Sequence, residues 1–545
     1  MAQKEEVLVE ISGIYVNFYT YQGIVQAIEG VDLTIRKGET LGLVGETGCG
    51  KSVTASAIMK LILSPPGKIE AGSIFFMEPP EVRAKRLEYE AKAQKWYSEM
   101  TPEKKKQAVR SYGMRFTGFK MRVKKLTPEE IKKLSIPERA PHRVVTSYMS
   151  RSAKTVPKED RVTLDALRRS YDLITKSTEY MQKIRGKWIS MIFQEPTSAL
   201  NPVFTAGDQI AEVILLHKKA EMAERALKRI DNEIKLMKEN KRPHMALKTF
   251  RTPAKGAKAS NPGTTRFVCS ICNAELKEYE RWCDKCGVDF YSGISWSIRR
   301  PVLETYKRFI LFAKKNPESK NPVLSKIPLI RRYNNYLLRE ARREAVNMLE
   351  IVRIPDPKGV AERYPYELSG GMQQRVMIAI ALACNPKLLI ADEPTTALDV
   401  TIQGQILKLM RDLKELYGSS ILLITHNLGV VAEMCDRVGV MYAGSMAEIG
   451  SARDIFKEPL HPYTAGLMKS VPSIQGDVEK LFTIRGSVPN LIYPPSGCRF
   501  HPRCDFARTY CTQVRPELKE VEEGHFVSCH KVTGVTDYVG STPLK

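Results

Sequence analysis

The chain has 545 residues, of which 43% are apolar and 8% are aromatic. A chain of this length and composition can bury one large core and at least one smaller domain. It contains no run of about 18 or more apolar residues, and residues 1–10 lack the basic and apolar stretches of a signal peptide. From these features we expect neither a membrane-spanning helix nor a secretory leader, and we expect a cytosolic location.

The net charge of +24 is concentrated in two segments. Residues 81–190 contain 28 Lys and Arg against 13 Asp and Glu, and residues 221–340 contain 26 against 13. The rest of the chain is slightly acidic, so these segments hold the whole basic excess. Such an excess is typical of a nucleic-acid or anionic-lipid contact, or of a solvated face.

The first predicted elements lead to a phosphate-binding loop. Residues 7–46 alternate β-type runs with turns, and the apolar run Thr40–Val44 predicts a buried strand. The following loop fits the pattern G-x-x-x-x-G-K-[ST] completely, and a helical pattern begins near Ser52. The loop residues are Gly45, Glu46, Thr47, Gly48, Cys49, Gly50, Lys51 and Ser52. Backbone amides of such a loop wrap nucleotide phosphates, Lys51 reaches the β- and γ-phosphates, and Ser52 ligates Mg²⁺. The sequence therefore predicts an ATP site.

Two segments after this loop differ in kind from the rest. Residues 78–183 resemble charged helices without sustained heptads. Residues 218–340 combine a polar stretch at 251–265 with paired cysteines and basic helix. Without them roughly 315 residues remain, a size typical of one ATPase domain with a tail. We therefore interpret both segments as basic inserts in a single ATPase.

A second dense block occupies residues 367–426. Its pattern predicts a helix at 376–383, a strand at 388–391, a helix at 402–417 and a strand at 421–425. Strands that alternate with helices indicate a mostly parallel α/β sheet. The first of these strands delivers Asp392 to the Mg²⁺ shell and places Glu393 to polarise an attacking water.

The segment Leu368–Arg375 resembles the signature sequence of ABC-type ATPases and stands just upstream of the Asp392 strand. The resemblance assigns Ser369, Gly370, Gly371 and Gln373 to nucleotide binding. It also implies that Gln194 is the Q-loop glutamine, which contacts Mg²⁺ and acts in catalysis, that Asp399 belongs to the D-loop, and that His426 is the switch histidine. Tyr21 is the expected adenine-stacking aromatic, with Tyr19 as a rival.

The C-terminal region resembles that of ATP-binding subunits of oligopeptide/dipeptide ABC importers. The motifs are His-Pro-Tyr-Thr-Ala-Gly-Leu at 461–467, a proline- and cysteine-containing stretch at 494–504, and the segment 194–202 within the ATPase. The resemblance covers residues 5–77, 184–217 and 341–531 and leaves out both basic inserts. It implies a peripheral subunit on the cytoplasmic face of the membrane, with peptides or oligosaccharides as cargo.

The same resemblance implies partners. Two ATPase subunits face each other head to tail, so Ser369 and Gly371 would contact ATP bound by the partner, which is expected to be a paralogue. Two transmembrane permease subunits and an extracellular substrate-binding protein complete such a transporter. The runner-up interpretation is an ABC-type ATPase that acts on nucleic acid through its basic inserts, and a contact of the inserts with anionic lipid is a further alternative.

Eight of the cysteines form two clusters. Cys269, Cys272, Cys283 and Cys286 have the paired-knuckle spacing that predicts a Zn²⁺ ribbon, against the alternative of four unliganded thiols. Cys498, Cys504, Cys511 and Cys529 have spacing that leaves metal ligands and buried thiols equally open. For this second cluster the family resemblance implies a [4Fe–4S] cluster, with Zn²⁺ as the runner-up. The nearby His501, His525 and His530 are either structural or replacement ligands.

The predicted fold is thus an α/β ABC-type P-loop ATPase with a helical subdomain, a basic helical insert, a zinc-ribbon-like insert and a cysteine-rich C-terminal domain. The first part of the ATPase core is expected at residues 5–77, and a further part with the Q-loop is expected at 184–217. The first basic insert is expected at 78–183. The second basic insert is expected at 218–340, with its zinc-ribbon-like knuckles at 269–286. Residues 341–455 contain the signature and the second part of the core, and 456–545 form the C-terminal domain.

Overall fold

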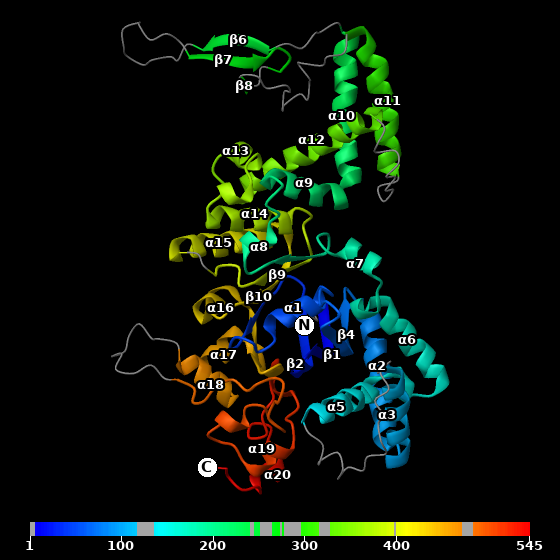
Figure 1. The fold of residues 1–545 in the computed structure, drawn as a ribbon, viewed down its shortest axis with the longest axis vertical. Coiled ribbons are helices and arrows are strands. Elements are labelled where there is room, and N and C mark those ends of the chain that lie inside the picture. The colour runs from blue at the N-terminus through cyan, green and yellow to red at the C-terminus, as the bar shows by residue number, and fades with distance from the viewer. Residues whose placement is uncertain are drawn as a thin grey trace, which may run out of the picture. The chain divides into compact units, whose positions relative to one another are not determined.

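The computed structural model of the chain describes residues 6–116, 136–239, 245–250, 264–272, 275–276, 296–315, 328–396, 399–470 and 483–544. These residues form two compact units (Figure 1). The first unit comprises Met1–Glu195 together with Asn385–Lys545, and the second comprises Pro196–Cys384. Each unit is described by itself below.

The first unit is organised by a sheet with the strand order β13-β14-β12-β11-β3-β10-β9-β5. Its strands are β3 (Thr40–Val44), β5 (Ile189–Ile192), β9 (Leu388–Asp392), β10 (Ser420–Ile424), β11 (Arg437–Tyr442), β12 (Ser445–Ser451), β13 (Lys519–Glu522) and β14 (His525–Val527). The five strands from β11 to β5 pair in parallel, and the others pair antiparallel. The mostly parallel α/β sheet predicted from the sequence is confirmed.

The parallel strands are buried, which explains their continuous apolar runs. Every residue of β3, β9 and β10 is buried, and their side chains join one hydrophobic core. Helices follow the strands: α1 (Lys51–Ile58), α15 (Val400–Tyr417), α16 (Leu428–Met434) and α17 (Ala452–Lys457). Loops that follow β3, β9 and β10 share one edge of the sheet, because parallel strands all end there.

A smaller antiparallel sheet of order β2-β1-β4 packs onto the same core. Its strands are β1 (Val7–Thr20), β2 (Gly23–Arg36) and β4 (Gly67–Phe76). The segment 78–183, which is predicted to be the first insert, follows β4. The helices of this part of the chain are α2 (Pro80–Glu99), α3 (Pro102–Phe116), α5 (Ile136–Arg151), α6 (Lys158–Tyr171) and α7 (Thr178–Ile184). Two short 3₁₀ turns, η1 (Ala153–Thr155) and η2 (Leu173–Thr175), connect the later helices.

The first insert is attached to this sheet by a buried charge cluster. Arg86 on α2 is fully buried. Its guanidinium donates to Glu78 at 2.9 and 3.0 Å and to Glu90 at 3.0 Å, and it pairs with Glu10 of β1 at 3.0 Å. The guanidinium carbon also lies 3.7 Å from the centre of the Phe75 ring.

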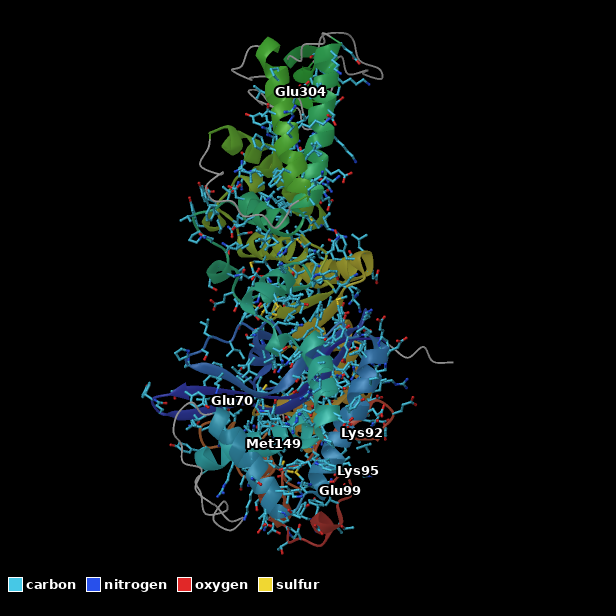
Figure 2. The ribbon with its side chains drawn as sticks, turned by 90° about the vertical axis from the view of Figure 1, so that its right-hand side faces the viewer. Glu70, Lys92, Lys95, Glu99, Met149 and Glu304 are labelled. Carbon is cyan, nitrogen blue, oxygen red and sulfur yellow. The ribbon has the colours of Figure 1, made fainter. Side chains whose placement is uncertain are left out.

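Further arginines of the insert pair with acids of the sheet. Arg151 at the end of α5 pairs with Asp32 on β2 at 3.0 Å, and Arg143 faces Glu29 on β2 at 3.9 Å. Part of the basic excess of residues 81–190 therefore neutralises acids of the sheet and is not free for another partner. Other basic side chains of the described part of this segment are exposed, among them Lys92 and Lys95 along α2, which Figure 2 labels.

The second unit is largely helical. It contains α8 (Pro196–Ala199), α9 (Ala206–His217), α10 (Lys219–Lys238), α11 (Trp296–Lys315), α12 (Pro328–Ile351), α13 (Pro357–Ala361), the 3₁₀ turn η4 (Pro365–Glu367) and α14 (Gly370–Leu382). Helices α10 and α11 lie side by side (Figure 1). A three-stranded sheet of order β6-β7-β8 joins Met245–Phe250, Thr264–Cys269 and Glu275–Leu276.

The C-terminal region extends the main sheet of the first unit through β13 and β14. It also contains α18 (Pro462–Lys469), the 3₁₀ turn η5 (His501–Arg503), α19 (Thr509–Gln513) and α20 (Thr536–Val539). The motif at 461–467 is a helix start: His461 Nδ1 accepts from the Tyr463 amide at 3.0 Å. Burial lowers the pKa of His461 to about 4, so the ring stays neutral and keeps this acceptor.

Candidate nucleotide-binding site

The phosphate-binding loop joins β3 to α1, as the sequence predicts. Gly45 has a φ of 150°, and a Cβ there would lie 2.2 Å from the backbone oxygen of Met441. Gly50, with a φ of 103°, caps the N-terminus of α1. Only glycine fits both positions. The loop therefore turns its amides and a helix N-terminus toward one place, which is the arrangement that attracts phosphate.

The cation of the loop is buried and held by the loop itself. The Lys51 ammonium donates to the carbonyl of Gly45 at 2.8 Å and to that of Glu46 at 3.1 Å. The Cys49 thiol lies beneath it at 3.6 Å, and burial raises the pKa of this thiol. Cys49 is fully buried, so its side chain packs in the core and only its backbone is available to a ligand.

The predicted Mg²⁺ ligands from two distant segments come together. The Ser52 hydroxyl donates to Asp392 Oδ1 at 3.0 Å. Burial raises the pKa of Asp392, an effect that the hydrogen bond from Ser52 partly offsets. A hydroxyl and a carboxylate are oxygen ligands of the kind that Mg²⁺ prefers, so these residues fit the ion.

Glu393 is the centre of the predicted catalytic group. Its Oε2 accepts from Gln194 Nε2 at 3.0 Å, and its Oε1 lies 3.2 Å from His426 Nδ1. The Thr396 hydroxyl also donates to Oε2, at 2.9 Å. Glu393 adopts a φ of 48°, an uncommon conformation for a residue with a side chain. The structure therefore brings Gln194, Glu393 and His426 together.

The two candidate adenine-stacking aromatics differ in their surroundings. Tyr21 lies in the turn between β1 and β2 and is 97% exposed. The Tyr19 hydroxyl donates to Glu70 at 2.5 Å, and burial, together with this partner, raises its pKa. Tyr21 thus has its ring surface open to a ligand, whereas Tyr19 is tied to the sheet.

The signature residues lie in the second unit, at the start of α14. Ser369 is the residue before the helix, and it and Gly370 are exposed. Gly371 is buried. Gln373 is also buried, and its amide donates to the carbonyls of Pro365 and Leu368 at 2.8 and 3.3 Å. The Gln373 side chain therefore holds the turn before the helix, and the exposed N-terminus of α14 carries Ser369.

The D-loop is described in part. Ala397 and Leu398 lie outside the described residues. Asp399 is exposed and caps α15, since its Oδ1 accepts from the Ile402 amide at 2.8 Å.

The four C-terminal cysteines share one cavity. Cys498, Cys504, Cys511 and Cys529 all line it, and none forms a disulfide. Burial raises the pKa of Cys498 to about 12 and that of Cys504 to about 11, and the neighbouring cysteines add to the effect. Within the described ranges, no three His, Cys, Asp or Glu side chains are grouped closely enough to hold a single metal ion.

The second cysteine set is only partly described. Cys269 ends β7 and is buried, and Cys272 follows in a half-buried turn. Cys283 and Cys286 lie outside the described residues, so the structure gives no geometry for the predicted zinc knuckles.

Comparison with known proteins identifies the family. Residues 447–511 match the oligopeptide/dipeptide transporter C-terminal region, and residues 28–152 and 297–396 match the ABC transporter family. The chain is 32% identical to the oligopeptide transport ATP-binding protein AppD of Bacillus subtilis (strain 168) over 522 aligned residues, with 96% of each chain covered. The chain belongs to the oligopeptide/dipeptide transport family of ABC ATP-binding proteins. The dipeptide transport ATP-binding protein DppD of the same strain is 30% identical, with 96% of this chain and 94% of that protein covered.

Membership of the oligopeptide/dipeptide transport family confirms the main prediction from the sequence. The chain is an ATP-hydrolysing subunit of an ABC transporter with the ABC-type α/β ATPase fold. None of these matches supports the nucleic-acid alternative. Across the described part of the chain, no helix has the length and apolar character needed to cross a membrane.

Two residues at the ATP site of this family member were not found from the sequence. Thr396 donates to the Glu393 carboxylate, and Arg503 pairs with Glu46 of the phosphate loop at 2.7 Å. A threonine three residues after Glu393 carries no signal of its own. Arg503 is separated from Glu46 by 457 residues, so no local pattern connects the two.

Proposed function

We propose that the chain powers import of oligopeptides or dipeptides, or of oligosaccharides, through ATP hydrolysis at the loop Gly45–Ser52. The observation that carries the proposal is the convergence of Gln194, Thr396 and His426 on the Glu393 carboxylate. A carboxylate held from several sides is positioned to accept a proton from an attacking water.

Each residue then has a distinct part in the reaction. The loop amides and Lys51 bind the phosphates, and Tyr21 stacks on the adenine. Mg²⁺, held by Ser52 and Asp392 with Gln194 nearby, would neutralise phosphate charge. Glu393 orients the water, and His426 contacts both the Glu393 carboxylate and the γ-phosphate.

The proposal includes a second ATPase subunit, because the signature acts in trans. Ser369 and Gly371 would donate to the phosphates of ATP bound by the partner, with Gly370, Gln373 and Asp399 supporting that interface. The exposed N-terminus of α14 supports this role, since a helix N-terminus favours an anion. A paralogous partner, two permease subunits and an extracellular substrate-binding protein complete the assembly, with this chain on the cytoplasmic face of the membrane.

The purified chain alone should hydrolyse ATP slowly and gain activity in the assembled transporter. The expected gain is on the order of 10²-fold, because each subunit lacks the transition-state donors that its partner supplies. Steady-state phosphate release from the chain alone and from the reconstituted complex measures it. High activity in a demonstrably monomeric sample would contradict donation in trans. Stimulation of the complex by peptides, and not by oligosaccharides, would fix the cargo class.

The proposal assigns a structural [4Fe–4S] cluster to Cys498, Cys504, Cys511 and Cys529. The support for this assignment is that all four cysteines line one cavity and that the family resemblance implies a cluster held by four cysteines. His501 and His530 line the same cavity, and each has one ring nitrogen within hydrogen-bond distance of a backbone carbonyl, at 2.8 and 2.9 Å. The other ring nitrogen of each stays available, so both histidines stay replacement ligands. Zn²⁺ is the second candidate.

A Zn²⁺ ion at Cys269, Cys272, Cys283 and Cys286 is also part of the proposal. Its support is the paired-knuckle spacing and the position of Cys269 and Cys272 at the end of β7 and in the next turn. A small sheet with little core gains most of its stability from such an ion.

Metal analysis of the full-length chain, purified without oxygen, tests both sites together. We expect about four iron atoms per chain from the C-terminal cluster and about one zinc from the knuckles. Cys504→Ser should remove the iron and its visible absorption and leave the zinc, whereas Cys269→Ser should do the reverse. Colourless protein with stoichiometric zinc in the C-terminal region would refute the cluster and favour Zn²⁺ there.

The exposed lysines of the first insert support contact with anionic lipid near the permease. Lys85, Lys95, Lys104 and Lys106 are exposed along α2 and α3. Each basic side chain near an anionic surface contributes about 1 kcal/mol to binding. The ion-paired arginines of the insert are excluded from this role, because they already pair with acids of the sheet.

A further inference from the structure

Arg503 connects the C-terminal region to the phosphate loop. It ends the turn η5 directly before Cys504, and its side chain is only 5% exposed. Its two terminal nitrogens donate to the two carboxylate oxygens of Glu46, at 2.7 and 3.1 Å. This is the bidentate geometry of the strongest arginine–carboxylate pairs.

The Arg503 guanidinium is fixed independently of Glu46. Its Nε donates to the backbone carbonyl of Arg485 at 2.8 Å, and one terminal nitrogen donates to the Tyr442 hydroxyl at 3.3 Å. The guanidinium carbon also lies 5.7 Å from the centre of the Tyr442 ring. Because the guanidinium has these other contacts, it can set the position of the carboxylate.

The backbone of Glu46 is held as well. Its amide donates to the Tyr463 hydroxyl at 3.0 Å, and its carbonyl accepts from the Lys51 ammonium at 3.1 Å. Glu46 therefore joins the cation that reaches the phosphates to two residues, Tyr463 and Arg503, that lie far along the chain.

A free carboxylate at this position would oppose nucleotide binding. The loop attracts phosphate through amide dipoles and Lys51, and an unpaired negative charge on Glu46 would repel the same phosphate. Attachment of the C-terminal region does not require Arg503, because Arg499 and Arg515 already pair with Glu29 of β2, at 2.6 and 3.1 Å.

We propose that Arg503 is a positioning residue for ATP binding, which cancels the charge of Glu46 and holds the loop backbone beside Lys51. The proposal rests on ATP binding at the phosphate loop. It extends that function by giving the cysteine-bearing segment of the C-terminal region a direct effect on nucleotide affinity.

The test is binding of a fluorescent N-methylanthraniloyl-ATP with Mg²⁺ by the full-length chain. Arg503→Ala should weaken binding about tenfold, because it leaves a negative charge unpaired beside the phosphates. Arg503→Gln, which keeps hydrogen-bonding groups but removes the charge, should also weaken binding. Arg503→Lys keeps the positive charge but lacks the two terminal nitrogens of the guanidinium, so it should lose less affinity than the other two variants. In the assembled transporter, Arg503→Ala should raise the KM for ATP by more than it lowers kcat.

The deciding measurement is the double variant Arg503→Ala with Glu46→Gln. It should recover most of the lost affinity, because no charge then needs a partner, whereas a merely structural role of Arg503 predicts no recovery. Arg515→Ala is the matched control. It removes the salt bridge between Arg515 and Glu29, which lies in the same region but does not touch the phosphate loop, and the variant should bind the probe as the parent chain does.

Two results would overturn the proposal: parental affinity in Arg503→Ala or Arg503→Gln, or no recovery in the double variant. Lys51→Ala separates this outcome from a failure of the site itself. If Lys51→Ala binds the probe as the parent does, the phosphate loop is not the binding site. If Lys51→Ala loses binding and the Arg503 variants do not, only the role of Arg503 fails.

Discussion

Glu393→Gln should abolish ATP turnover in the assembled transporter while ATP stays bound. Glutamine keeps the size of the side chain and one acceptor oxygen, which can still accept from Gln194 and Thr396, while its NH2 group can donate to the His426 ring nitrogen. It cannot accept a proton from water, and loss of a general base costs about 10²–10⁴ in rate. Phosphate release and nucleotide retention after rapid gel filtration measure the two effects separately.

The variant should also accumulate a closed dimer with ATP at both interfaces, since opening follows hydrolysis. Lys51→Ala serves as the comparison, because it removes the cation of the phosphate loop and should lose ATP binding and hydrolysis together. Near-normal hydrolysis by Glu393→Gln would remove Glu393 from its proposed role and leave the carboxylate of Asp392 as the remaining acid at the site.

The proximity of the proposed catalytic residues could be predicted because each stands in a short motif at a strand end. The loop after β3, the pair Asp392 and Glu393 at the end of β9, and His426 after β10 stand at the ends of strands that are buried throughout. Parallel strands end at one edge of a sheet, so local patterns place these residues together without knowledge of the rest of the fold. The contact of Gln194 with Glu393 follows the same rule, because β5 pairs with β9.

Contacts between distant segments without a shared strand edge could not be predicted. Arg503 and Glu46 come from opposite ends of the chain, and neither has a neighbouring pattern that names the other. Helix α12, which runs from Pro328 to Ile351, contains the predicted boundary at residue 340.

The charge distribution was informative about the inserts but incomplete about their partners. Residues 81–190 carry part of the basic excess, and the sequence alone leaves nucleic acid, anionic lipid and a solvated face as its possible explanations. The structure pairs Arg86, Arg151 and Arg143 with acids of β1 and β2 instead. Net charge counts cannot find such pairs, because they depend on which helix face lies against which strand.

Arg86→Ala should destabilise the first unit by about 3–5 kcal/mol, because it leaves buried carboxylates without a counter-charge. Glu78, Glu90 and Glu10 all lie within 3.0 Å of this guanidinium. Burial already raises the pKa of Glu78, and removal of Arg86 would raise it further. The variant chain should therefore lose stability most at neutral pH and less at acidic pH, where these carboxyls take up protons.

Chemical denaturation and hydrogen exchange over α2 measure this loss. Lys92→Ala is the matched control on the same helix, because its partner Glu88 is exposed and the pair should contribute no measurable stability. Arg86→Met combined with Glu78→Gln should recover part of the loss, since fewer uncompensated charges stay buried. If Arg86→Ala instead left exchange in α2 and β1 unchanged, the buried cluster would not be what holds the first insert to the ATPase sheet, and the apolar contacts of Phe75 would have to carry that attachment.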